Sequence, residues 1–226
     1  VRRRQVLIEL NGNTFTVQAG AMQWMAGDVS ATTGIKGAGD FLSKTIRGKV
    51  TGESVIKPEY TGDGTLVLEP TYKHIILLDL DEWGNSIVLD DGLFLACEST
   101  LKQKAVRRKT FSSVFAGGEG FFNLGLKGSG VVCIESDCSR EELVEITLED
   151  DVVKIDGNLA IAWSGSLDFT VERAGKSLLG SAASGEGLVN VYRGTGKVLL
   201  APVGNQAMKP QQVIEKEPVI VGDDDE

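Results

Sequence analysis

Acidic side chains are the most abundant groups in this chain that could do chemistry, with 32 Asp and Glu residues against a single His. Paired carboxylates can perform acid–base catalysis on glycosides, and carboxylate clusters can bind Ca²⁺. Each cluster, however, falls beside a predicted turn, where such residues commonly act as solvated turn formers. We therefore expect structural roles, with a carboxylate-dependent enzyme as the alternative. The clusters are Asp79, Asp81 and Glu82; Asp90 and Asp91; and Glu149, Asp150 and Asp151.

Histidine and cysteine give little support for a catalytic or metal site. A cupin-type metal site needs two or three His residues, and a Ser-His-Asp triad would have to use His74 without any Gly-x-Ser-x-Gly turn. Cys97, Cys133 and Cys138 are odd in number and include no Cys-x-x-Cys pair, so neither a disulfide framework nor a zinc ribbon is indicated. We expect buried thiols in a reducing compartment, a cytoplasmic location, no cofactor, no metal and no enzymatic activity.

The charge balance bears on the class of partner. The chain has 226 residues and a net charge of −9. We do not expect nucleic-acid binding as a general activity, because neutralising phosphates needs an excess of Lys and Arg on one face. No apolar run of about 18 residues occurs, so a transmembrane segment is not expected either.

A Gly-Glu-Gly motif and a later Gly-x-Gly motif recur along the chain. The Gly-x-Gly pairs begin at Gly62, Gly128 and Gly194, which are equally spaced (128 − 62 = 194 − 128). Such spacing indicates repeated structural units. The repeated Glu residues could meet as an acidic site, but we favour carboxylates that accept backbone N–H bonds in glycine-flanked turns. The repeat-marking residues are Gly52 and Glu53; Gly118, Glu119 and Gly120; and Gly185, Glu186 and Gly187.

Predicted β-strands surround these motifs in the same order three times. Each unit begins with a predicted hairpin, clearest at Asn11-Gly12, because Asn-Gly between β-forming residues is a strong hairpin signal. The predicted hairpins join 6–10 to 14–18, 75–80 to 87–89, and 143–148 to 152–155. The three units span about 6–69, 75–135 and 143–201.

These patterns predict an all-β fold in a single domain, residues 1–203. We expect the three repeats to form small β-sandwiches in a closed, pseudo-threefold arrangement, since closure leaves fewer open sheet edges. Residues 204–226 form a predicted acidic tail, whose apolar run 219–221 could add a strand to a sheet edge.

The connectors before each Gly-Glu-Gly motif mix basic and apolar residues, with spacing in the first two that suits a short amphipathic helical turn. They predict a basic, partly apolar face for an anionic membrane surface or a protein partner. The alternative is that the apolar residues fill the core or an oligomer interface while the bases are solvated. The candidate residues are Lys102, Lys104, Arg107, Arg108, Lys109, Phe111, Phe115, Lys44, Arg47 and Lys49.

Three of these motifs together resemble the altered-inheritance-of-mitochondria protein 24 family, over residues 6–201. They are Gly20-Ala21-Met22 with Met25-x-Gly27-Asp28-Val29, then 115–122, and then 178–180 with 185–189. The resemblance implies a TRAP-like fold, related to the tryptophan RNA-binding attenuation protein. It carries over no catalytic residue, and it implies a link to mitochondrial inner-membrane organisation for the mitochondrial member.

The function expected from these observations is that of a non-enzymatic structural or interaction protein. It would self-associate as a homo-oligomer, with a role in membrane organisation implied by the resemblance. A small-ligand or RNA-binding regulator of the TRAP-like type is the main alternative, and the carboxylate-dependent enzyme is the second.

Overall fold

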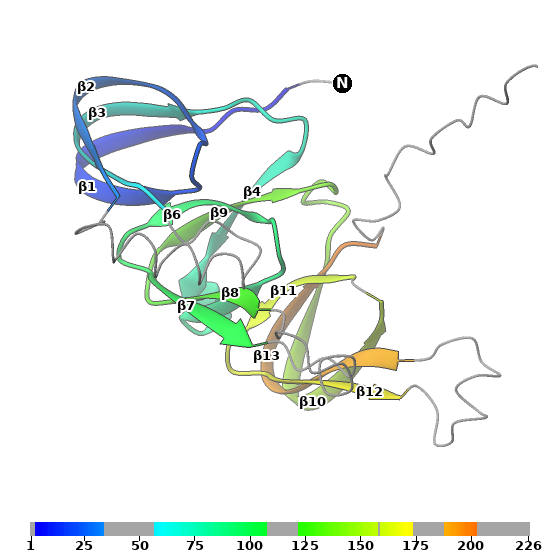
Figure 1. The fold of residues 1–226 in the computed structure, drawn as a ribbon. Helices are drawn as coiled ribbons and strands as arrows, with labels where there is room; N and C mark the ends of the chain where they lie inside the picture. Colours follow the sequence, from blue (N-terminus) through cyan, green and yellow to red (C-terminus); the bar gives the residue numbers. More distant parts are fainter. Residues whose placement is uncertain (1–2, 34–56, 108–121, 158, 174–187, 203–226) are drawn as a thin grey trace, which may run out of the picture.

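The computed structural model describes residues 3–33, 57–107, 122–157, 159–173 and 188–202 (Figure 1). Within these ranges the chain forms two antiparallel β-sheets and one short 3₁₀ helix, η1 (Leu80–Trp83). The all-β fold predicted from the sequence is thereby confirmed. The predicted tail, 204–226, lies outside the described residues.

The first sheet contains the strands from the start of the chain, and the second contains those from its end. Strands from the middle of the chain enter both sheets. The first has the order β2 (Met22–Thr32), β3 (Glu59–Leu68), β1 (Leu7–Val17), β6 (Phe94–Glu98), β9 (Val131–Ser136) and β4 (His74–Asp79). The second has the order β10 (Val144–Asp156), β13 (Leu188–Leu200), β11 (Ala160–Ser164), β5 (Ser86–Leu89), β8 (Phe122–Lys127) and β7 (Lys102–Arg107), with β12 (Asp168–Arg173) also paired to β13.

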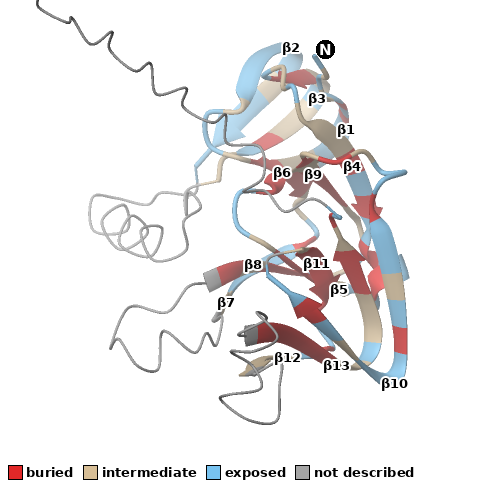
Figure 2. Ribbon diagram, turned by 90° about the vertical axis from the view of Figure 1, so that its right-hand side faces the viewer, coloured by how far each residue is buried: buried red, intermediate tan, exposed pale blue. Residues whose placement is uncertain are grey.

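The burial of each strand follows its place in the sheet (Figure 2). Central strands such as β6 and β11 are buried along most of their length, and their sequences are almost continuously apolar or small. β1 instead alternates at its start, with Ile8 and Leu10 buried between exposed neighbours, as expected for a sheet with one solvated face.

Three hydrophobic clusters make up the core. The central cluster joins the two sheets, since it contains Ile76 and Ile134 of the first sheet and Ile87 and Ile161 of the second. A second cluster lies around Leu10 and the strands of the first sheet. The third cluster, in the second sheet, includes Trp163 and Tyr192, whose ring centroids are 5.3 Å apart. Burial of these apolar side chains is the main source of stability.

The predicted hairpins are wrong, because the segments on either side of each predicted turn do not pair with each other. β1 runs through Gly12 and β10 runs through Asp150, each with a local bulge. These residues have φ angles of 72° and 52°, which suits a bulge as well as a turn. In the middle of the chain, η1 separates β4 from β5, and the two strands enter different sheets.

The Gly-x-Gly motifs form bends inside or between strands. β3 and β13 continue through 62–64 and 194–196, whereas 128–130 links β8 to β9. Gly62, Gly128 and Gly194 have φ angles of 131°, 135° and 114°, a region that disfavours residues with a Cβ. The glycines therefore let the backbone bend at three equally spaced points of the chain.

Candidate functional site

A hollow of about 400 Å³ lies where strands β7 and β8 face the segment after β11. Its lining includes the aromatic residues Trp163 and Phe169, the basic residues Lys104 and Lys127, and the acidic residue Asp168. Trp163 stacks on Phe169 with ring centroids 5.6 Å apart. Two aromatic residues and two lysines in one lining suit a ligand with an apolar body and a negative charge.

The strand register gathers lysines on one face next to this hollow. Lys102 lies directly opposite Lys127 across the β7–β8 pair, and Lys104 follows two residues along β7. Residues opposite each other, and residues two apart in one strand, share a face of the sheet. All three side chains are exposed. We call Lys102, Lys104 and Lys127 the basic face.

The predicted connector site is only partly described. Lys102 and Lys104 are exposed on β7, and Arg107 ends that strand. The segment is a strand paired with β8, so the predicted helical turn is wrong for 102–107. The other residues predicted for the connector site lie outside the described residues, namely Arg108, Lys109, Phe111, Phe115, Lys44, Arg47 and Lys49. The repeat-marking residues also lie outside them, namely Gly52, Glu53, Gly118, Glu119, Gly120, Gly185, Glu186 and Gly187.

The carboxylate clusters take part in local structure. Asp79 caps η1, because its Oδ1 accepts the Asp81 N–H at 3.0 Å. Asp90 accepts a hydrogen bond from the Asn123 side chain at 3.3 Å. The Asp151 carboxylate accepts the N–H of Val152 at 2.7 Å, within the β10 bulge. These contacts agree with the structural roles expected for the clusters.

Histidine and cysteine do not assemble a site in the described part of the chain. His74 is partly buried at the start of β4. Cys97, Cys133 and Cys138 are buried, and burial raises the pKa of the Cys97 and Cys133 thiols to about 12. Thiolates are the reactive form, so these two side chains behave as small apolar core residues. Among the described residues, no group of three His, Cys, Asp or Glu side chains is placed to hold a metal ion.

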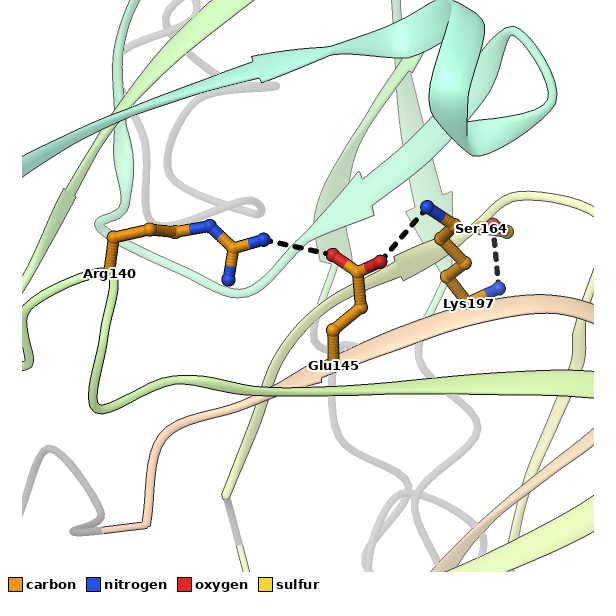
Figure 3. Close-up of polar contacts among 4 residues, drawn as sticks. All are labelled: Arg140, Glu145, Ser164 and Lys197. Atoms are coloured by element: carbon orange, nitrogen blue, oxygen red, sulfur yellow. Dashed lines mark hydrogen bonds and ion pairs between the residues drawn. The ribbon is translucent and has the colours of Figure 1, made fainter.

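A polar network anchors the start of β10 to its neighbours (Figure 3). The Glu145 carboxylate contacts Arg140 at 3.1 Å and the Lys197 ammonium at 2.9 Å. The backbone N–H of Lys197 donates to Ser164 Oγ of β11 at 3.0 Å, and its ammonium lies 5.8 Å from the Trp83 ring centroid. The network connects β10, β11 and β13 to η1, and it is a structural support.

A strand junction joins β1 to β6 in the first sheet. Three residue pairs face each other across it: Phe15 with Glu98, Thr16 with Cys97, and Val17 with Ala96. Backbone hydrogen bonds close its two ends, from the Gln18 N–H to the Leu95 carbonyl at 2.8 Å and from the Ser99 N–H to the Thr14 carbonyl at 3.0 Å.

A second junction, between β5 and β11, has the same register. Its facing pairs are Ile87 with Ser164, Val88 with Trp163, and Leu89 with Ala162. Its closing bonds run from the Asp90 N–H to the Ile161 carbonyl at 2.9 Å and from the Gly165 N–H to the Ser86 carbonyl at 2.8 Å. The residue numbers of equivalent positions in β1 and β5 differ by one constant, and those in β6 and β11 differ by another (90 − 18 = 87 − 15 and 161 − 95 = 164 − 98).

Sequence reasoning missed Lys127 and the two junctions. Lys127 follows a predicted strand and reaches the basic face only through the β7–β8 pairing, which no local pattern reveals. One sequence feature could have indicated the junctions, namely the constant spacing of the Gly-x-Gly pairs. Equivalent residues of β6 and β11 differ in number by the same spacing. The described part of the chain contains no helix long and apolar enough to cross a membrane.

The chain is an all-β protein with recurring glycine motifs, and comparison with known proteins identifies its family. A family model described as "Mitochondrial biogenesis AIM24" matches residues 2–203. The chain belongs to the AIM24 family, which confirms the resemblance seen in its motifs. It is 30% identical over 204 residues to the uncharacterized protein M6_Spy0233 of Streptococcus pyogenes, covering 86% of this chain and 80% of that protein. It is also similar to the crystal structure of protein SPYM3_0169 from Streptococcus pyogenes, at 29% identity, a TM-score of 0.65 and 90% coverage of both chains.

Proposed function

We propose that this protein is a non-enzymatic interaction module whose basic face docks on an anionic membrane surface. The observation that carries the proposal is the grouping of Lys102, Lys104 and Lys127 on one exposed face of an otherwise acidic chain. A lysine near an anionic bilayer contributes about 1 kcal/mol to binding. The name of the family, which refers to mitochondrial biogenesis, is compatible with a role at a membrane.

The proposal includes a three-unit, TRAP-like architecture. Support comes from the pairing of the strands: in each third of the chain, one strand lies between the other two, as β3 does between β1 and β2 and β13 does between β10 and β11. β8 and β9 hold the same place in the middle third. The two junctions in one register are a second support.

The membrane proposal is tested by co-sedimentation with vesicles that contain an anionic lipid, at low and at physiological salt. We expect binding that weakens with salt. The double variant Lys104→Gln/Lys127→Gln should lose about 2 kcal/mol, which is roughly a 30-fold weaker partition. A matched double variant, Arg3→Gln/Lys73→Gln, removes the same charge elsewhere and should bind almost normally. Equal losses in both variants, or no binding to anionic vesicles, would contradict the proposal.

A small-ligand site in the hollow is a second candidate function. The stacked rings of Trp163 and Phe169 beside Lys104 favour an aromatic or other planar anion. Titration with a panel of aromatic carboxylates, followed by calorimetry, tests this candidate. The variant Phe169→Leu should then weaken ligand binding while it leaves vesicle binding unchanged. Vesicle binding without any response to the panel would remove the second candidate alone.

A further inference from the structure

The outer edge of β2 is equivalent to the edges that β6 and β11 contribute to the two strand junctions. Trp24 of β2 lies opposite residue 67, as Ala96 of β6 lies opposite residue 133 and Ala162 of β11 lies opposite residue 199. Those partners are equally spaced (133 − 67 = 199 − 133), and a register shift precedes all three strand positions. Residues 23–27 of β2 therefore correspond to 95–99 of β6 and to 161–165 of β11.

The outer edge of β10 is equivalent to the edges that β1 and β5 contribute to the same junctions. Val153 of β10 lies opposite residue 192, as Phe15 of β1 lies opposite residue 60 and Ile87 of β5 lies opposite residue 126. These partners have the same spacing (126 − 60 = 192 − 126). Residues 152–156 of β10 therefore correspond to 14–18 of β1 and to 86–90 of β5. In the described part of the chain, β2 pairs with β3 and β10 pairs with β13, and neither edge has a second strand beside it.

The two outer strands, β2 and β10, carry most of the exposed large apolar side chains of the described residues, and three of these side chains, Trp24, Met25 and Val152, lie in the two edge segments. Eight such side chains are exposed, and five of them lie on β2 or β10: Met22, Trp24, Met25, Val144 and Val152. Sheet edges that remain in water usually carry charges or proline to prevent pairing. The segment 23–27 contains neither. Its composition is that of a strand with a neighbour.

We propose that the 152–156 edge of β10 pairs with the 23–27 edge of β2 in a second copy of this chain, in the register of the two internal junctions. In this contact Val153 faces Ala26, Lys154 faces Met25 and Ile155 faces Trp24. The closing hydrogen bonds run from the Asp156 N–H to the Gln23 carbonyl and from the Gly27 N–H to the Val152 carbonyl. The proposal rests on the three-unit architecture proposed above.

The two edges cannot meet within one chain, because β2 and β10 lie at opposite ends of the molecule (Figures 1 and 2). In this proposal, contact between chains takes the place of the closure that was predicted within one chain. Because the two surfaces of the contact differ, it is a head-to-tail contact, which closes into a ring or extends into a filament according to the rotation at each step.

Disulfide trapping tests the register directly. Val153 and Ala26 correspond to Phe15 and Glu98, a pair that lies between the hydrogen-bonded positions of the first junction. Cα atoms of such pairs are about 4.5 Å apart, which is within the range for a disulfide. A mixture of the Val153→Cys and Ala26→Cys chains should form a cross-linked dimer under mild oxidation, and neither chain should do so alone. The native thiols of Cys97, Cys133 and Cys138 are all buried and so are shielded from this reaction.

The controls separate this contact from other assemblies. Ser30→Cys lies roughly 13 Å further along β2 on the same face and should not cross-link to Val153→Cys. A single variant that cross-links to itself indicates a two-fold contact and overturns the proposal. A protein that sediments as an oligomer without the trapped disulfide also overturns it, while leaving the membrane function intact. A further control deletes residues 219–221 of the same chain. If this deletion makes residue 26 accessible, the chain's own segment covers the β2 edge, and the proposal is overturned as well.

A charge test at one position gives an independent readout. Met25 faces Lys154 in the proposed contact, and like charges opposite each other destabilise a strand pair. Met25→Lys should therefore weaken association measured by sedimentation velocity, by about two- to fivefold in Kd, and Met25→Glu should retain it. Adding Lys154→Glu to Met25→Lys should restore it. Equal behaviour of Met25→Lys and Met25→Glu would overturn the register, whatever the vesicle assays show.

Discussion

Strands β2 and β6 occupy the same place in the strand pairing and differ in almost every measure of burial. Each contains a register shift, after which Trp24 of β2 pairs with Val67 and Ala96 of β6 pairs with Cys133. Four of the five residues of β6 are buried, whereas ten of the eleven residues of β2 are exposed. Trp24 exposes 47% of its surface, and Ala96 at the corresponding position exposes 2%.

The difference between the two strands comes from their neighbours. β6 has β9 on one side and β1 on the other, and β11 is enclosed in the same way by β13 and β5. In the described residues β2 has only β3. The same backbone arrangement thus forms a core strand when a second neighbour is present and an exposed apolar edge when it is absent.

The largest test of this comparison places a charge at corresponding positions. Ala162 of β11 is fully buried, so Ala162→Glu leaves an uncompensated buried charge and should cost about 3–5 kcal/mol. Trp24→Glu should change the stability of the single chain by less than about 0.5 kcal/mol, as for exposed sites. The midpoints of urea unfolding at low protein concentration measure both. Similar losses in the two variants would break the comparison.

The middle strands provide a graded test. Alanine at any of the three corresponding glycines must adopt a strained φ, at about 1–3 kcal/mol. At Gly62 the added Cβ would also collide with the Asp28 carbonyl of β2, at Gly128 it would lie 3.1 Å from the Thr100 carbonyl, and at Gly194 it would have no neighbour closer than 3.9 Å. Thermal unfolding should rank the losses Gly62→Ala, then Gly128→Ala, then Gly194→Ala. A reversed order would mean that bending, and not close approach, sets the cost.

A third test exchanges the residues of the two strands. Ala96→Trp inserts the β2 side chain into the closed junction, and overpacking of this kind costs about 1–3 kcal/mol. Trp24→Ala should leave single-chain stability nearly unchanged but should abolish any concentration-dependent shift in fluorescence. That shift reports on β2, because Trp83 and Trp163 are 2% and 4% exposed. A stable Ala96→Trp protein would show that the junction has unused space.

The smallest effect concerns the turn that leads into β10. The Ser139 N–H donates to the Glu142 carboxylate at 2.7 Å and lowers the pKa of that group. A lowered pKa gives stability that is present above the ordinary pKa of Glu and is lost as pH falls through the folded value. Glu142→Gln should therefore lower the melting temperature slightly at pH 7, and the difference should shrink as pH falls below the ordinary pKa of Glu, about 4.3. An unchanged difference across this pH range would show that hydrogen-bond geometry, and not ionisation, matters.

The sequence predicted the local elements of this fold better than their connections. The segments 75–80 and 87–89 correspond to β4 and β5, and three glycine motifs were enough to recognise the family. The hairpins failed because a glycine such as Gly12 with positive φ serves a bulge as well as a turn. Only pairing with a distant strand, β3, distinguishes the two outcomes, and such pairing leaves no local mark in the sequence.

The candidate site shows the same limit. Lys102 and Lys104 were identified from composition, but Lys127 joins them through a register between two strands that a long connector separates in the chain. The apolar residues Met22, Trp24 and Met25 have the composition of a core strand, because a sequence does not state which strand lies at the edge of a sheet. Their exposure became visible only with the strand order.

The order of the strands also affects the chain while it is being made. β1 ends at Val17, but its partner β6 ends at Glu98, about 80 residues later. At a translation rate of about 5–20 residues per second, the nascent β1 waits roughly 4–16 s for this partner to leave the ribosome. During that interval the unfinished protein displays an apolar strand edge of the kind that chaperones bind. β5 and β11 impose a second waiting period of the same nature further along the chain.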